Sequence, residues 1–133
     1  MRKCFSFVGT GELKPARYTL GKNRSDTCVI QQALAEFYQP DLTVLFVTGK
    51  ARTGNLPKVI TSLKEHPYTV IDIPDGQTDT ELWEIFNKIS GQVSPEDEIL
   101  LDITHAYRFM PFLAFLTALY IREVAGAGLC GVV

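Results

Sequence analysis

The sequence of 133 residues lacks the features that mark membrane proteins and binders of long nucleic acids. Its longest apolar run, residues 109–121, is shorter than the ~20 residues that a membrane-spanning helix needs, and the amino terminus has no long apolar signal region. With 13 Lys and Arg against 15 Asp and Glu, the net charge of -2 does not draw the chain onto long nucleic acid or acidic membranes. We therefore expect a cytoplasmic protein that binds neither.

Cysteine and histidine are also scarce. Cys4, Cys28 and Cys130 show no C-x-x-C spacing, and their odd number leaves no complete disulfide framework, so we expect reduced, buried thiols. No His, Cys, Asp and Glu cluster has metal-ligand spacing, and the sequence therefore indicates no metal and no cofactor. The remaining composition, 46% hydrophobic and 21% charged, is that of a globular protein. Its length predicts one domain over residues 1–133.

Short apolar runs rich in β-branched residues alternate with segments of helical periodicity. The expected strands are Lys3–Val8, Leu42–Val47, Tyr68–Ile73, Glu98–Ile103 and Leu129–Val133. The expected helices cover residues 29–37, 56–63 and 82–89 and begin a fourth time near Pro111. Because such alternation implies parallel strands joined by right-handed crossovers, the sequence predicts an α/β, Rossmann-like fold. Its sheet should be mostly parallel, with about five or six strands and helices on both faces.

Particular side chains carry further structural expectations. Ser25 or Asp26 is a candidate N-cap for the first helix, and Thr78 or Asp79 for the third. Trp83 lies beside the apolar face of its helix, where we expect core packing rather than base stacking.

In an open parallel sheet, ligands bind beyond the carboxyl ends of the strands, where the strand order reverses. For the order 3-2-1-4-5, the turns after the first and fourth strands flank that crevice. The first turn is Gly9-Thr10-Gly11, in which glycine admits close approach of a ligand and the Thr10 hydroxyl can donate to a phosphate oxygen. A tight strand exit would use the same residues, and the third glycine of a dinucleotide motif is absent.

The second turn is richer in polar side chains. Five residues of this turn are candidates for ligand binding: Thr104, His105, Ala106, Tyr107 and Arg108. They precede the helix expected near Pro111, and helix N-termini attract anions. The Arg108 guanidinium can hold a phosphate with a fork of N–H donors. Capping of the turn by Asp102 and Thr104, with His105 bonded to backbone, is the structural alternative.

Two further basic residues could extend this site. Lys50 follows the second strand, although a solvated loop is the simpler account of that segment. Arg17 lies in the long connection between residues 11 and 24, which is basic and long enough to form a flap or hairpin.

Several segments resemble a known family: Phe5-Ser-Phe-Val-Gly-Thr-Gly, Ile73-Pro-Asp-Gly with Glu81-Leu-Trp-Glu-Ile-Phe, and above all Asp102-Ile-Thr-His-Ala-Tyr-Arg-Phe-Met-Pro. They are similar to the CRISPR-associated Rossmann fold (CARF) domain over nearly the whole chain. Ala106 stands where relatives usually carry glycine. The resemblance implies a homodimer whose paired pockets bind one cyclic oligoadenylate, the messenger of type III CRISPR antiviral defence. The apolar helix from Phe112 to Ile121 is a candidate for the dimer interface.

Family members usually continue into a C-terminal effector, often a ribonuclease with a closely spaced Arg and His. This sequence has no Arg and His separated by four to six residues, which is the spacing of that signature. We therefore expect either a sensor fragment from which a C-terminal effector domain is missing or an unusually short stand-alone form. One function that fits is a sensor that binds cyclic tetra- or hexa-adenylate. The alternative is a ring nuclease that cleaves the ring by metal-independent attack of a ribose 2′-hydroxyl, with Thr10, His105 and Arg108 as catalytic residues. A generic nucleotide-binding Rossmann domain ranks below both, because no acidic residue follows the second strand.

Overall fold

The fold is seen in a computed structural model that describes residues 1–106, 110–124 and 126–133. Its main sheet contains five parallel strands: β1 (Arg2–Phe7), β4 (Leu42–Val47), β5 (Tyr68–Asp72), β6 (Glu98–Asp102) and β7 (Gly128–Val132). Their order is β5-β4-β1-β6-β7. In the main sheet this is the predicted order 3-2-1-4-5, with β1 in the centre, and the α/β, Rossmann-like fold is confirmed.

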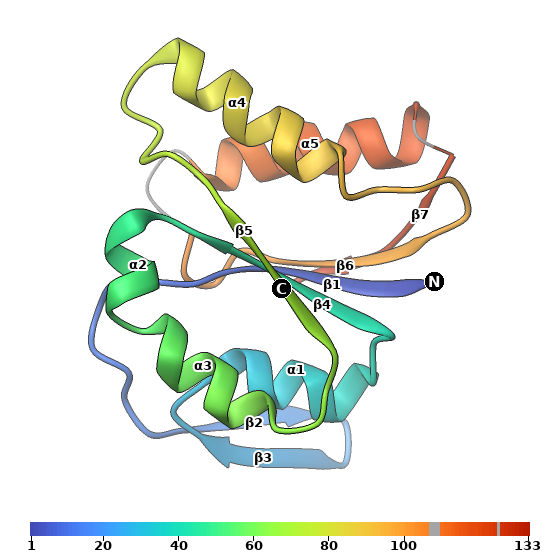
Figure 1. Ribbon diagram of the computed structural model, residues 1–133. Coiled ribbons are helices and arrows are strands. Elements are labelled where there is room, and N and C mark those ends of the chain that lie inside the picture. The colour runs from blue at the N-terminus through green and yellow to red at the C-terminus, as the bar shows by residue number, and fades with distance from the viewer. Residues whose placement is uncertain (107–109, 125) are drawn as a thin grey trace.

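Helices cover both faces of the sheet (Figure 1). On one face lie α4 (Asp79–Ser90) and α5 (Met110–Glu123), and on the other lie α1 (Ile30–Tyr38) and α3 (Leu56–Leu63). The central strands are buried on both sides, which explains their continuous apolar runs. Phe5 and Phe46 pack against Ile85 and Ile89 on the α4 side, while Leu45 packs in a second cluster on the α3 side.

The long connection after β1 forms an antiparallel hairpin of β2 (Ala16–Leu20) and β3 (Asn23–Thr27). The expected hairpin is therefore confirmed, and Figure 1 shows it beyond α1, on the side away from the sheet. The short helix α2 (Gly49–Thr53) was not predicted, because five residues are too few to show helical periodicity. Within the described residues, none of the helices has the length and hydropathy required to cross a bilayer.

The cap prediction for α4 is confirmed, and that for α1 is wrong. The Thr78 hydroxyl oxygen accepts a hydrogen bond from the Glu81 N–H at 3.2 Å. The residues proposed to cap α1, Ser25 and Asp26, instead belong to β3. The helix begins after Val29, whose extended backbone carries no capping side chain. Ser25 and Asp26, which the sequence pattern placed at the start of the helix, therefore lie in a strand of the hairpin.

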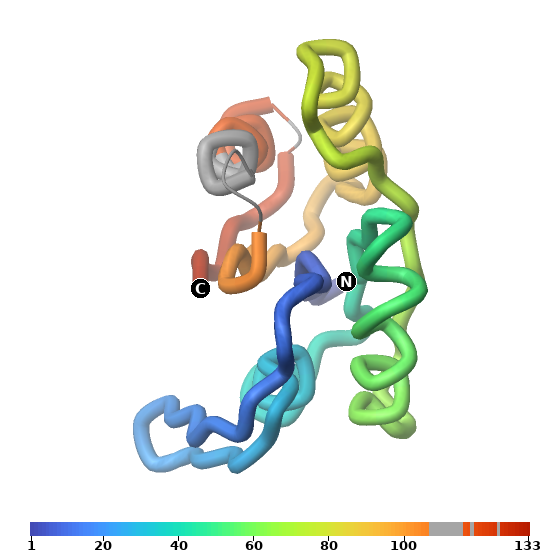
Figure 2. Tube along the Cα trace, turned by 90° about the vertical axis from the view of Figure 1, so that its left-hand side faces the viewer, coloured from blue at the N-terminus to red at the C-terminus, as the bar shows by residue number. Residues whose placement is uncertain are grey.

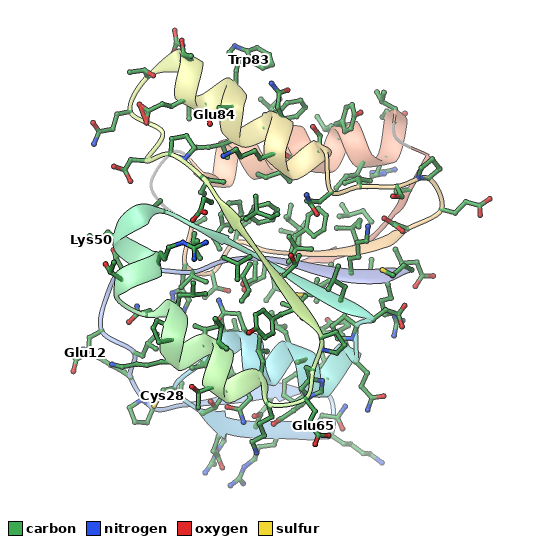
Figure 3. The ribbon with its side chains drawn as sticks, viewed as in Figure 1. Glu12, Cys28, Lys50, Glu65, Trp83 and Glu84 are labelled. Carbon is green, nitrogen blue, oxygen red and sulfur yellow. The ribbon has the colours of Figure 1, made fainter. Side chains whose placement is uncertain are left out.

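Two predictions of burial are also wrong. Trp83 is 67% exposed and points away from the sheet (Figure 3), because it lies on the face of α4 opposite the buried Ile85 and Ile89. Cys130 is exposed on the edge strand β7, and Cys28 is only half-buried. Of the three cysteines, Cys4 alone fits the expected buried thiol. All three are free thiols, as expected.

Candidate functional site

The turns that follow β1 and β6 lie side by side at the carboxyl edge of the sheet (Figure 2). Gly9 packs against His105 so closely that a Cβ on Gly9 would stand 3.0 Å from the His105 Cβ. Because β1 pairs directly with β6, the two turns leave the sheet as neighbours. The strand order thus joins two polar segments that are almost one hundred residues apart in sequence.

A buried side chain from a third segment holds the first turn. The Asn55 side-chain nitrogen, Nδ2, donates to the backbone oxygens of Gly9 and Gly11, both at 2.8 Å. Thr10 between them is half-buried, whereas Gly11 is exposed. Sequence reasoning missed Asn55, since the only signal was an asparagine in an ordinary position at the start of a helix.

A buried hydrogen-bond network anchors the second turn. Asp102, 0% exposed, accepts from the Ser6 hydroxyl at 2.6 Å and from the Thr104 N–H at 3.0 Å. The Gln31 side chain of α1 donates to the Ser6 hydroxyl oxygen at 3.0 Å. Asp102 therefore caps the turn, as the structural alternative predicted for this residue. Burial, and to a lesser extent the Asp102 carboxylate, raises the pKa of the nearby Cys4 thiol above its usual range.

The other described residues of the second turn differ in their surroundings. Thr104 is exposed, and His105 is half-buried, with no hydrogen bond from its imidazole to any residue that the structure describes. Ala106 packs against the core, and its N–H donates to the Ile103 carbonyl at 3.1 Å. The predicted site residues Tyr107 and Arg108 lie outside the described residues.

The model of one protein family, the CARF domain of the CRISPR system endoribonuclease Csx1, matches residues 49–127. This match covers more than half of the chain. The chain belongs to the Csx1 CARF domain family. It is a CARF domain protein of type III CRISPR systems, as the resemblance of its motifs predicted. No curated protein matches the sequence.

The matched residues of this CARF domain include the whole second turn, whereas Gly9-Thr10-Gly11 precedes them. Two matched residues contact the first turn: His105 packs against Gly9, and the Asn55 side chain donates to the Gly9 carbonyl oxygen. The family's description names an endoribonuclease because Csx1 carries such a domain. The match concerns the CARF domain and assigns no endoribonuclease activity to this chain.

Basic residues of the CARF domain line the same edge next to β4. Lys50 is exposed in α2, which follows β4 directly (Figure 3). Arg52 forms an ion pair with Asp72 at 2.7 Å, and its hydrogen bond lowers the pKa of that carboxyl. Arg52 is thus paired with Asp72, the last residue of β5, while Lys50 extends toward solvent.

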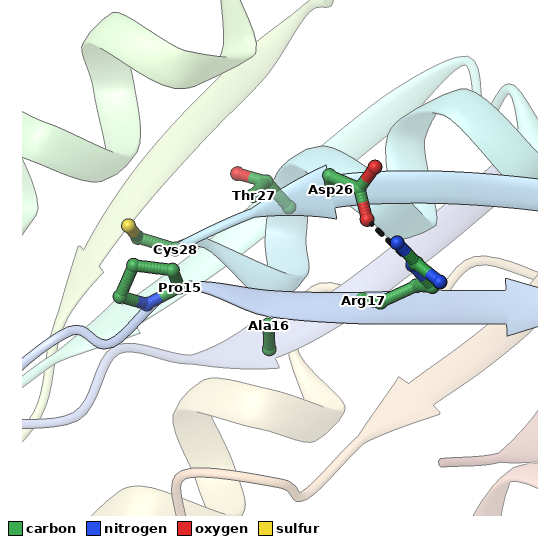
Figure 4. Close-up of a pocket in the computed structure, with 6 residues that line it drawn as sticks. All are labelled: Pro15, Ala16, Arg17, Asp26, Thr27 and Cys28. Carbon is green, nitrogen blue, oxygen red and sulfur yellow. Dashed lines mark hydrogen bonds and ion pairs between the residues drawn. The ribbon is translucent and has the colours of Figure 1, made fainter.

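Arg17 lies apart from these turns, on the β2–β3 hairpin. Its guanidinium pairs with Asp26 at 3.1 Å (Figure 4). The two side chains border an open hollow of about 490 Å³ that Pro15 and Cys28 also line. The structure does not bring Arg17 together with Gly9 and His105. Among the residues that the structure describes, no group of three or more His, Cys, Asp or Glu side chains is placed to hold a metal ion.

Proposed function

We propose that this CARF domain binds cyclic oligoadenylate at the carboxyl edge of its sheet and thereby senses infection in type III CRISPR antiviral defence. The observation that supports this proposal most is the contact between Gly9 and His105. It gathers a glycine turn, the Thr10 hydroxyl and the His105 imidazole at one edge of the sheet. The exposed Lys50 follows β4, the strand next to β1, at the same edge. A ring of phosphodiesters needs such donors at short range, rather than the broad basic surface that binds long nucleic acid.

The proposed sensor is a homodimer that encloses one ring. Leu116 and Leu119 of α5 are each 42% exposed, although leucine is most often buried. The same surface on a second copy would cover them through a twofold axis. A cyclic ligand presents repeated, equivalent phosphates, so two identical edges can contact it in the same way.

Isothermal titration with cyclic tetra- and hexa-adenylate, combined with light scattering, tests this function. We expect one ring per dimer. His105→Ala should weaken binding by at least about tenfold, equivalent to ~1.4 kcal/mol. The matched control is His66→Ala, because the other histidine precedes β5 at the amino edge of the sheet. Absence of heat from every ring with the wild-type protein would remove the proposal.

The setting of His105 favours a second candidate function, a ring nuclease. Its imidazole packs on the turn that holds Thr10, and histidine is the side chain most often used for proton transfer in catalysis. In this reaction a ribose 2′-oxygen attacks the adjacent phosphorus, a 2′-O–P bond forms, and the P–O5′ bond breaks. His105 would accept the 2′-hydroxyl proton or protonate the departing 5′-oxygen, while Thr10 and Arg108 would stabilise the phosphorane.

The products are a 2′,3′-cyclic phosphate and a 5′-hydroxyl. Incubation of labelled ring in EDTA, followed by thin-layer chromatography, distinguishes this enzyme from a sensor. Intact ring after hours with excess protein would exclude useful turnover. Cleavage by wild-type protein and by His66→Ala, but not by His105→Ala, would support it.

A further inference from the structure

The Asn55 side chain lies at the start of α3 but does not cap that helix. Asn55 is the N-cap residue of α3, where asparagine ordinarily accepts a hydrogen bond from the first turn of its own helix. Here the side chain makes no such bond. Only 8% exposed, it instead donates to Gly9 O and Gly11 O, across 46 and 44 residues of sequence. The amide thus joins the start of α3 to the turn after β1.

This clamp fixes the orientation of two peptide groups. One nitrogen atom holds both carbonyl oxygens, so both C=O bonds point toward Asn55. In a trans peptide the N–H points opposite to the C=O, and no cis peptide bond occurs in the described chain. The N–H groups of Thr10 and Glu12, which belong to these two peptides, therefore point away from Asn55.

These two N–H groups are not used within the described part of the protein. Neither donates to any residue that the structure describes. Asn55 follows β4, on one side of β1, whereas β6 and its turn lie on the other side. The Glu12 side chain is exposed and extends outward (Figure 3). Backbone N–H groups without a partner inside the protein can donate hydrogen bonds to phosphate oxygens.

We propose that Asn55 is a positioning residue for phosphate binding, which turns the Thr10 and Glu12 N–H groups away from α3 and leaves them open to the phosphates of the ligand. This inference rests on the proposed function and adds to it the residue that prepares the first turn. Without the clamp, the glycines on both sides of Thr10 would let the peptide groups rotate. The ligand would then have to order them at the expense of its affinity.

Two substitutions separate this role from helix capping. Asn55→Asp has the same shape and caps a helix equally well, but its carboxylate has no hydrogen to donate to the carbonyls. Asn55→Ser also caps well, adds no charge, and is too short to reach both oxygens. The matched control is Asp97→Asn, which makes the reverse exchange of amide and carboxylate at the opposite edge of the sheet, where Asp97 binds Lys3 at 2.7 Å.

The experiment is titration of cyclic tetra- and hexa-adenylate into the full chain, by calorimetry and by ¹H–¹⁵N spectroscopy. We expect both Asn55 variants to bind at least about tenfold more weakly than wild type, and Asp97→Asn to bind within about twofold. Ligand should shift the Thr10 and Glu12 amide signals in wild type and in Asp97→Asn, but not in the Asn55 variants. The spectra also report whether each variant is folded.

The outcomes separate the two proposals. No binding by the wild-type chain would overturn the proposed function, and this inference with it. Binding by wild type with undiminished affinity in Asn55→Ser would overturn the positioning role alone. If Asn55→Asp fails to fold, the serine variant decides by the same criteria.

Discussion

Replacement of Gly9 by alanine tests the contact that joins the two turns. The added Cβ would lie 3.0 Å from Cβ and 3.3 Å from Cγ of His105, whereas carbon atoms in contact prefer about 3.5–4.0 Å. Gly9 is not among the glycines with positive φ, so its own backbone conformation admits alanine. The turns must therefore separate by roughly half an ångström.

The expected cost follows from this overlap. Overpacking of a close contact costs about 1–3 kcal/mol, which for a domain of this size lowers Tm by roughly 3–12 °C. Gly11→Ala is the matched control, because a Cβ there meets nothing within 4 Å and φ is not positive. Alanine at that position removes freedom from the unfolded chain and should stabilise the protein by about 0.4–1 kcal/mol. The two substitutions in one turn are thus expected to have opposite signs.

Equilibrium urea unfolding of the free protein measures both effects, and a double-mutant cycle identifies their cause. His105→Gly removes the Cβ that alanine would meet, so the cost of Gly9→Ala should fall close to zero in that background. Equal costs with and without His105→Gly would refute the assigned contact. A Gly9→Ala protein as stable as Gly11→Ala would refute the proximity of the turns.

Three further predictions concern stability and exposure. Asp102→Asn should lower the free energy of unfolding by about 1.5–3 kcal/mol, since the buried Ser6 hydroxyl loses its charged acceptor; an unchanged urea midpoint would contradict the network. Burial raises the pKa of Asp97, but the hydrogen bonds from Lys3 and from the Ser94 N–H, together with the charges of Lys3 and the amino terminus, outweigh burial and lower it. The stability that this pair contributes is therefore complete above about pH 4 and is lost as the pH falls toward the folded-state pKa. Asp97→Asn should remove this part of the acid dependence of the urea midpoint, and an unaltered pH profile would count against it. Fluorescence of Trp83, the single tryptophan, should be readily quenched by acrylamide, and Trp83→Ala should change stability by less than about 1 kcal/mol; a shielded tryptophan in dilute protein would oppose its exposed position.

The strands could be predicted from sequence because each is decided by its own local pattern. Leu42–Val47 is a continuous apolar run with turn residues after it, and the structure has β4 with the same bounds. The alternation of strands and helices indicated a Rossmann-like sheet, and the usual strand order of such a sheet, 3-2-1-4-5, was assumed for this chain. Since order fixes neighbours, the proximity of Gly9 and His105 was also within reach of the sequence.

The misses occurred where tertiary contacts decide a side chain's surroundings. Periodicity gave the limits of α4 but not which flank of the helix faces the sheet, so Trp83 was assigned to the core. Ser25 and Asp26 have the chemistry of N-caps, yet pairing with β2 placed them in a strand. Asn55 stands at a helix start, where no local pattern indicates that its amide reaches a turn more than forty residues away.

The polar groups of β1's two ends serve different purposes. At the amino end, Lys3 and Asp97 form a buried ion pair, and both charges satisfy each other within the protein. At the carboxyl end, the buried side chains of Asn55 and Asp102 form hydrogen bonds with backbone groups of the two turns and so hold those turns in place. Ordering these turns lowers the conformational entropy of the chain and so opposes folding. The same order favours ligand binding, because preorganised donors bind more tightly than donors that the ligand must order.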